Sequence, residues 1–448
     1  MNRAEDAYPT AHEVLTARDV LTARDVLTAR DVLTTRDKGL PDRAVGRTVA
    51  EFLATGPRLR EFWTPLIALD DAAMTANIAT MAAWCAERGF DLMPHGKTTM
   101  APALWQRQLD AGATGITLAT MGQVRTGRDL GLTSIMLANA AVDPRSLAWL
   151  AGELADPDFR FVCWADSLAT VEAMEAGLIA GGAPRAVDVC VELGAAGGRT
   201  GARSAAEAVA VAERIAASPV LRLAGVSGYE GSLGHDRSPA SLSAVTAYLE
   251  AQLDLHGALA PLYDDGDLVV TAGGSAYFDI VARVWEGAAR DGRTRFTLRS
   301  GAYITHDDGF YRGISPFDEG ASSGAGGETA EAPRFVNALH GFARVVSSPE
   351  PGLALVDGGK RDFPYDEGLP IPRAWRIDAS EPWRPLQATV SAMNDQHSYV
   401  RSEEHLPIGA EIRLGLSHPC TAFDKWRLLP VVASADSDLV VDLVRTWF

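Results

Sequence analysis

The chain of 448 residues has few cysteines and no long apolar run. Its four cysteines form no CxxC pair and no dense framework, a pattern typical of a protein that stays reduced. No stretch approaches the roughly twenty apolar residues that a membrane span needs. Residues 1–10 also lack the apolar segment of a signal peptide. We therefore expect a cytoplasmic protein that has no contact with a membrane.

An excess of basic residues is missing as well. The 58 acidic residues outnumber the 41 lysines and arginines, so the formal net charge is -17. Such a chain repels nucleic acid and anionic membrane surfaces, which we exclude as partners. The remaining composition, with 47% hydrophobic residues, is ordinary for a globular protein of about two or three domains.

Residues 14–37 repeat the hexad V-L-T-A-R-D and end in a T-T-R-D variant. A period of six matches neither the 3.6 residues of a helical turn nor the heptad of a coiled coil. The Val-Leu pairs would rotate around a helix instead of forming one stripe. The sequence predicts a repetitive tail over residues 1–39, disordered or frayed, with no part in catalysis.

From residue 64 onward, short apolar stretches alternate with helical ones. About eight strand–helix units in roughly 230 residues are typical of a (β/α)8 TIM barrel, an α/β fold. A doubly wound open sheet is the alternative, but residues 69–73 lack its glycine fingerprint. The predicted strands are Pro65–Leu69, Phe90–Met93, Gly115–Leu118, Ser134–Leu137, Phe159–Trp164, Val187–Leu193, Leu221–Ser227 and Leu268–Ala272.

After about residue 295, short alternating segments replace the helical pattern and predict a C-terminal β-rich domain. We expect residues 64–295 to form the barrel, and residues 40–63 and 296–448 to form the β-rich domain that carries a metal site. Residues 320–332 are rich in glycine and serine, which predicts a mobile surface loop. The predicted strands of this domain include Arg295–Arg299, Phe342–Val346, Leu353–Val356, Gln387–Met393, Glu411–Gly415 and Leu428–Val432.

The segment M-P-H-G-K-T, residues 93–98, closes the second predicted strand. Barrel enzymes place their active sites at this end of the strands. A lysine that is desolvated or crowded by cations there can form a Schiff base with an aldehyde. Lys97 is therefore the candidate catalytic residue, with a solvated surface lysine as the alternative. His95 could reach the same site or be structural.

Further candidates follow later strands. Gly273, Gly274 and Ser275 close the eighth predicted strand, where many barrels bind a phosphate with backbone N–H groups and a helix start. A plain turn fits the same residues. The remaining candidates, each of which could also belong to a structural turn, are Arg199, Tyr229 and Tyr303.

His418 and Cys420 stand two residues apart near the end of the chain. In an extended segment this spacing places an imidazole and a thiolate on one face. Together they form a soft ligand pair that suits zinc. Two protein ligands would leave positions for water or substrate, as a catalytic metal requires. A satisfied histidine beside a buried thiol is the alternative.

The P-H-G-K-T and H-P-C motifs, in this order, resemble the D-serine dehydratase/D-threonine aldolase-like family of fold type III PLP (pyridoxal 5'-phosphate) enzymes. These enzymes are relatives of alanine racemase, and the chain looks most like the amino acid deaminase branch over residues 64–448. The resemblance implies that Lys97 is the Schiff-base lysine, with His95 beside it, and that Arg199 contacts the polar edge of the ring. It implies cofactor contacts or metal ligands for a further set: Tyr229, Gly273, Gly274, Ser275, Tyr303, His418 and Cys420.

The resemblance also implies an activity. The dehydratase branch has His-x-Cys and zinc, whereas the aldolase branch has His-x-Asp, so Cys420 favours a dehydratase. We expect β-elimination from a D-amino acid such as D-serine, giving a keto acid and ammonia, in a homodimer. The alternatives are metal-dependent aldol cleavage of D-threonine or another D-3-hydroxy amino acid, and racemisation. A PLP-binding protein without turnover agrees less well with the β-rich domain and its metal pair.

Overall fold

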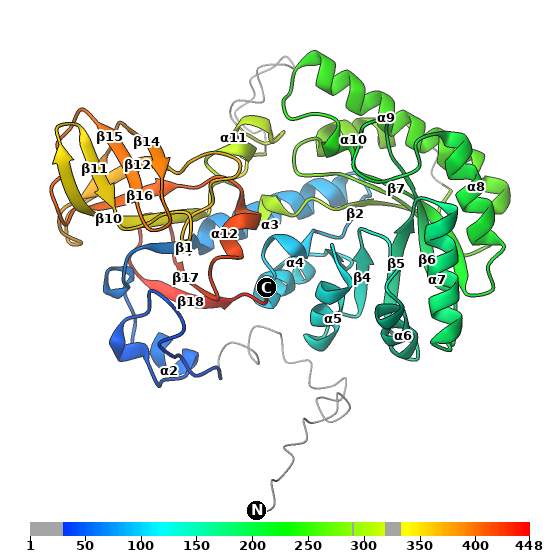
Figure 1. The fold of residues 1–448 in the computed structure, drawn as a ribbon, viewed down its shortest axis with the longest axis horizontal. Helices are drawn as coiled ribbons and strands as arrows, with labels where there is room; N and C mark the ends of the chain where they lie inside the picture. Colours follow the sequence, from blue (N-terminus) through cyan, green and yellow to red (C-terminus); the bar gives the residue numbers. More distant parts are fainter. Residues whose placement is uncertain (1–29, 289–290, 319–332) are drawn as a thin grey trace, which may run out of the picture.

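The computed structural model describes residues 30–288, 291–318 and 333–448, which build two β-sheets. One is a curled sheet of eight parallel strands wrapped by helices, and the other is a ten-stranded, mainly antiparallel sheet (Figure 1). The parallel sheet forms the TIM barrel that the sequence predicts, and the second sheet forms the β-rich part.

The barrel strands follow the order β2-β9-β8-β7-β6-β5-β4-β3. A parallel bridge between His95 and Thr117 joins the two ends of this series. The amide of Thr117 donates to the carbonyl of Pro94 at 2.9 Å, so the segment after β2 closes the barrel. A doubly wound open sheet is thereby excluded. The strands are β2 (Asp91–Leu92), β3 (Ile116–Leu118), β4 (Ser134–Leu137), β5 (Arg160–Ala165), β6 (Val187–Leu193), β7 (Leu221–Gly228), β8 (Leu268–Ala272) and β9 (Thr294–Leu298).

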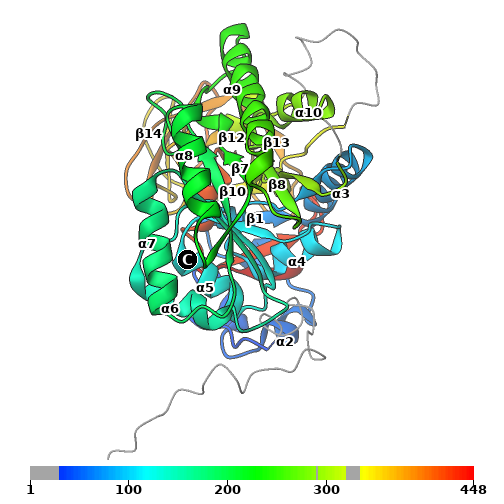
Figure 2. The ribbon, with the colours of Figure 1, turned by 90° about the vertical axis from the view of Figure 1, so that its right-hand side faces the viewer.

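Helices link these strands, and α5 to α9 lie on the outside of the barrel (Figure 2). Most begin at a capping side chain that accepts a hydrogen bond from an amide in the first turn, as Thr120, Ser167 and Ser204 do. No helix in the described ranges has the length and apolar character needed to cross a membrane. The helices are α3 (Asp71–Glu87), α4 (Pro102–Asp110), α5 (Met121–Asp129), α6 (Pro144–Glu153), α7 (Leu168–Ala180), α8 (Ala205–Ala216), α9 (Pro239–Ala258) and α10 (Phe278–Glu286).

The second sheet runs in the order β13-β12-β16-β10-β1-β17-β18, and β11, β15 and β14 extend it from β10. Two short helices, α11 (Phe310–Ile314) and α12 (Pro419–Phe423), lie where this sheet meets the barrel (Figure 1). The strands are β1 (Leu66–Asp70), β10 (Leu339–Glu350), β11 (Leu353–Val356), β12 (Ile371–Arg376), β13 (Arg384–Pro385), β14 (Ala388–Met393), β15 (Ser398–Ser402), β16 (Glu411–Gly415), β17 (Leu428–Val432) and β18 (Val440–Arg445).

Two strands belong to the other sheet than the sequence predicts. The first predicted barrel strand is β1, which pairs with β10 and β17 of the second sheet. The segment 295–299, predicted for the β-rich domain, overlaps β9, which pairs with β8 and β2 in the barrel. Both are short strand-forming segments, and the sequence of such a segment does not specify which strands it pairs with. The predicted domain limits otherwise stay a prediction.

Part of the predicted tail is ordered. Leu33 has no exposed surface, and its amide donates to the carbonyl of Arg47 at 2.8 Å. Asp31 and Asp37 form ion pairs of 2.5 and 3.0 Å with Arg445 on β18. The prediction of a disordered tail is therefore wrong for residues 30–39. Leu33 packs in the hydrophobic core, and Arg445 pairs with both aspartates. Residues 1–29 of the tail and the predicted loop 320–332 lie outside the described residues.

Candidate active site between the barrel and the second sheet

Lys97 lies on a short 3-10 helix, η3 (Gly96–Thr98), directly after β2. A Cβ atom at Gly96 would come within 2.6 Å of Ile116 Cγ2 and 2.8 Å of Trp105 Nε1, so only glycine fits here. The indole of Trp105 donates to the carbonyl of Gly96 at 3.1 Å. These contacts press the turn against β3 and α4 and fix the backbone from which Lys97 projects.

The surroundings of Lys97 favour its neutral amine. Its side chain is half-buried, and burial is the main cause that lowers its pKa. The positive charges of Arg199 and Arg299 lower it further, whereas Cys420 acts in the opposite direction. A lysine whose pKa is lowered in this way offers more free amine to attack a carbonyl carbon.

Arg299 is a buried cation that the sequence analysis left out of the candidate site. It is 3% exposed, and its guanidinium donates to Thr271 Oγ1 at 2.6 Å and to the carbonyl of Gly228 at 2.5 Å. The same group lies over the ring of Trp164, 4.7 Å from its centroid. Arg299 follows β9, the strand that the sequence analysis assigned to the other domain, and that error concealed its place inside the barrel.

Arg199 and Tyr229 come together at the ends of β6 and β7. The guanidinium carbon of Arg199 is 4.8 Å from the centre of the Tyr229 ring, and both residues line a small cavity with Glu192. The loop that carries Arg199 is fixed by Arg203, which donates to the carbonyls of four residues between 195 and 200. The structure thus brings these two predicted residues close to each other.

His95 is close to the same cations. Burial is the first cause that holds its pKa well below the ordinary value, followed by the charges of Lys97, Arg299 and Arg199. The imidazole therefore stays neutral at physiological pH. Its Nδ1 atom is buried and has no hydrogen-bond partner among the described residues. A buried polar atom without a partner is suited to a polar ligand.

The glycine turn after β8 is hydrogen-bonded to the side chain of Glu230. The amides of Gly273 and Gly274 donate to the carboxylate of Glu230 at 3.0 and 2.5 Å. Glu230 has no exposed surface. In this structure Glu230 takes these two donors, and the phosphate contact of Gly273 and Gly274 stays a prediction. Ser275 Oγ accepts from the amide of Ala302 at 3.2 Å.

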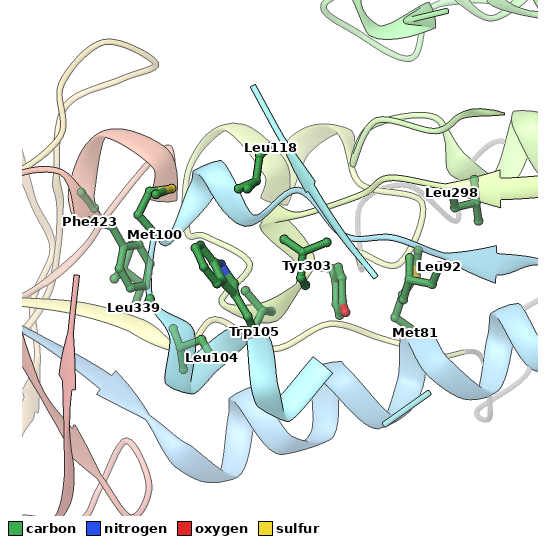
Figure 3. Packing of buried hydrophobic residues seen from close by; sticks show 14 of the residues in the cluster. Met81, Leu92, Met100, Leu104, Trp105, Leu118, Leu298, Tyr303, Leu339 and Phe423 are labelled. Atoms are coloured by element: carbon green, nitrogen blue, oxygen red, sulfur yellow. The ribbon is translucent and has the colours of Figure 1, made fainter. Parts of the chain in front are cut away.

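Tyr303 does not reach this group of residues. It is 2% exposed on η6 (Ala302–Ile304), and its hydroxyl accepts a hydrogen bond of 2.9 Å from Gln108. Figure 3 shows its ring among buried apolar side chains, with Trp105 nearby. In this structure η6 turns the ring toward α3 and α4, and the cofactor contact of Tyr303 stays a prediction.

Tyr311 on α11 is a second residue that the sequence analysis missed. Burial raises its pKa well above the ordinary value, and the negative charges of Cys420 and Tyr229 add to this effect. Its phenol therefore stays protonated next to the predicted metal pair. No motif or spacing in the sequence marks this tyrosine, and only the packing of α11 brings it to the site.

His418 and Cys420 meet at the start of α12, not on an extended segment. His418 is the N-cap of α12 and has left-handed backbone angles, φ 61° and ψ 86°. Pro419 at the first helical position begins the helix, which is why the predicted strand does not form. The two side chains still lie close enough for each to shift the pKa of the other: Cys420 raises that of His418, and His418 lowers that of Cys420. The predicted pair is therefore assembled, although by another backbone conformation.

The thiol of Cys420 connects this pair to the lysine segment. Its Sγ donates to Thr98 Oγ1 at 3.5 Å, and Thr98 follows Lys97 directly. Burial raises the pKa of Cys420, but His418, Thr98 and Lys97 together lower it below the ordinary value. A thiol with a lowered pKa is a good ligand for a soft metal. Within the described ranges no group of three or more His, Cys, Asp or Glu residues is arranged around a metal position.

The comparisons with known proteins match the barrel and the β-rich part of the chain separately. Residues 69–276 match the family model "Alanine racemase, N-terminal domain", and residues 338–432 match "Putative serine dehydratase domain". The chain is 29% identical to a D-threonine aldolase of Arthrobacter sp. over 384 residues, which covers 84% of this chain and 91% of the relative.

Two solved structures share the fold. The D-threonine aldolase of Filomicrobium marinum has a TM-score of 0.71 at 24% identity, covering 87% of this chain and 97% of its own. A cysteine-to-alanine variant of D-threo-3-hydroxyaspartate dehydratase, described as the metal-free form, has a TM-score of 0.66 at 23% identity and covers 86% and 97%. At these identities the structures support the fold alone.

Proposed function

Because this chain belongs to the D-serine dehydratase-like family of fold type III PLP enzymes, we propose that it is a PLP- and metal-dependent dehydratase of D-amino acids with a β-hydroxyl group. Its relatives are lyases that act on D-amino acids. The product would be a 2-keto acid and ammonia, as for D-serine.

One observation carries the proposal. Lys97, whose pKa is lowered, and His418 of the histidine–cysteine pair are 321 residues apart in the chain. A hydrogen bond between Cys420 and Thr98, the residue after Lys97, brings the two segments together. β-Elimination needs a base at the α-carbon and an acid at the β-oxygen of the same small molecule. Lys97 would supply the base, and a metal held by His418 and Cys420 would supply the acid.

The residues of the barrel half fit a bound PLP. Lys97 supplies the amine for the aldehyde, Arg199 and Arg299 supply cations for an anionic ligand, and His95 has an unpaired buried nitrogen. When bound, PLP supplies an electron sink for negative charge at the α-carbon. The phosphate would need donors other than Gly273 and Gly274, or a shift of Glu230.

Lys97 is placed to act as the base. Nζ of Lys97 would take the α-proton, and its lowered pKa makes the free amine available at a lower pH than for an ordinary lysine. After burial, the charges of Arg199 and Arg299 are the causes that lower this pKa further. Half-burial of the side chain limits the access of water to this amine.

His418 and Cys420 fit a metal with two protein ligands. An imidazole nitrogen and a thiolate suit zinc, and the open positions suit water and substrate. A bound zinc ion supplies Lewis-acid activation of the β-hydroxyl group. Tyr311, protonated and close to Cys420, is the nearby phenol that could provide a proton to the departing oxygen.

Aldol cleavage of a D-3-hydroxy amino acid is the second candidate. It is supported by the similarity to D-threonine aldolase, which extends over 84% of the chain. The same base and metal pair would serve that reaction, with the Cα–Cβ bond broken instead of the Cβ–O bond. Cys420 is the residue that favours the dehydratase, since the family resemblance implies His-x-Asp at this motif in the aldolase branch. Racemisation needs a second base, and no described residue is selected for that role.

The test is product analysis with the purified, PLP-loaded protein before and after chelation and return of zinc. Metal-dependent pyruvate and ammonia from D-serine would support the dehydratase. Glycine and acetaldehyde from D-threonine, without pyruvate from D-serine, would transfer the assignment to the aldolase. Absence of both products would contradict the proposal. A homodimer remains a prediction of the family resemblance, and a cytoplasmic location remains a prediction from the sequence.

A further inference from the structure

The carboxylate of Asp366 joins the metal pair from a remote segment. Its Oδ2 lies 2.5 Å from Nδ1 of His418, and its Oδ1 accepts a hydrogen bond of 2.6 Å from Thr421 Oγ1. Asp366 belongs to the connection between β11 and β12, 52 residues before His418. Both oxygens of the carboxylate are therefore directed by residues of the turn that starts α12.

We propose that Asp366 is a positioning residue that prepares His418 for the metal. A carboxylate on Nδ1 keeps a proton on that nitrogen and leaves the lone pair of Nε2 for a metal ion. It also fixes the rotation of the ring and makes the imidazole a stronger donor. The inference deepens the function proposed above, because it rests on the His418–Cys420 metal pair.

Asp366 is not assigned as a third ligand. In the described part of the chain, no three His, Cys, Asp or Glu side chains converge on one metal position. The carboxylate contacts Nδ1, so it lies on the side of the ring away from a metal bound at Nε2. Thr421 keeps the second oxygen engaged, which further removes it from direct metal binding.

The backbone of His418 needs this support. A non-glycine residue at φ 61° is strained unless its surroundings fix it. Asp307, which has no exposed surface, accepts from the amide of His418 at 2.9 Å and from the amide of Tyr311 at 2.8 Å. Asp307 thus holds the backbone and Asp366 holds the ring, and the two carboxylates come from different segments.

The experiment measures metal affinity in the full-length, PLP-loaded protein by competition of Zn²⁺ against a chromophoric chelator. Asp366→Asn should weaken Zn²⁺ binding by about 10- to 100-fold. The absorbance of PLP attached to the protein should not change, since Lys97 is untouched. Thr421→Val removes only the second partner of the carboxylate and should weaken binding in the same direction by a smaller factor.

Asp424→Asn is the matched control. Asp424 is an exposed carboxylate whose charge acts on Asp366 and His418, and its ion pair is with Lys425 at 3.9 Å. If charge alone mattered, this variant would weaken zinc binding as much as Asp366→Asn, which would overturn the inference. Equal affinity of Asp366→Asn and the wild type would overturn it as well. A wild-type protein that binds no zinc would overturn the metal pair itself, and the proposed function with it.

Discussion

The two halves of the candidate site are built in different ways. The lysine half follows a barrel strand, and its backbone is fixed by the pairing of neighbouring strands and by Gly96 against Trp105. The metal half is a left-handed turn that Asp307 and Asp366 hold from elsewhere in the chain. A residue at a strand end is placed by local order, whereas a residue on such a turn depends on remote side chains. The lysine half should therefore tolerate loss of the metal half better than the reverse.

The largest effect is expected for Lys97→Ala. The variant should lose turnover and the absorbance of PLP attached to the protein, because no other described lysine lies at the end of a barrel strand. Lys360→Ala, at an exposed lysine of the second sheet region, is the control and should behave like the wild type. If Lys97→Ala kept the absorbance of protein-attached PLP, Lys97 would not be the residue that binds PLP.

Loss of the metal half should be large but selective. His418→Ala and Cys420→Ala should each lower kcat by roughly 10²-fold or more, the size expected when Lewis-acid stabilisation is lost. The absorbance of protein-attached PLP should remain, since it depends on the other half. Kinetics with and without chelation check this prediction. An unchanged kcat in either variant, or in the wild type after chelation, would show that the pair has no catalytic role.

Arg299 acts by charge on the lysine half of the site. It lowers the pKa of Lys97, so its removal should raise that pKa and move the acidic limb of the kcat/KM profile to higher pH. A shift of one unit would reduce the rate on that limb by about tenfold. Arg299→Gln tests the effect, and Arg299→Lys, which keeps the charge, is the control. Equal profiles for both variants would contradict an electrostatic role.

The thiols offer a smaller, chemical comparison. Burial raises the pKa of Cys85 and of Cys190 to about 12, whereas that of Cys420 is lowered by His418 and its neighbours in spite of burial. The thiolate fraction at neutral pH is therefore largest at Cys420. Iodoacetamide at pH 7 should modify Cys420 first, and added zinc should slow the reaction. Peptide mapping that finds Cys85 modified first would contradict this order.

The smallest effect is expected at Tyr303. Tyr303→Phe removes one hydrogen bond with Gln108 and should cost about 1 kcal/mol of stability. PLP binding should not change, because the ring lies in the core. Tyr229→Phe, at a residue beside Arg199, is the comparison variant within the site. A clear loss of PLP affinity in Tyr303→Phe would restore the role that the sequence predicted for it.

The errors of the sequence analysis share one cause. Lys97, His418 and Cys420 are recognised from motifs, and the structure brings their segments together. Arg299 was missed because β9 was assigned to the wrong sheet. Leu33 was missed because its burial depends on its packing in the hydrophobic core of the folded chain. The pattern of apolar residues predicts which face of a segment is buried, but it does not predict which segment packs against that face.

The sequence by itself determined the alternation of strands and helices, the capped helix starts and the two motifs that mark the site, since these depend on residues close together in the chain. Tertiary structure decided which strands close the barrel, the conformation of His418 and the partners of its ring. It also gave the amides of Gly273 and Gly274 to Glu230. Each of these outcomes depends on contacts between distant segments, whose free energy appears only when the whole chain has packed.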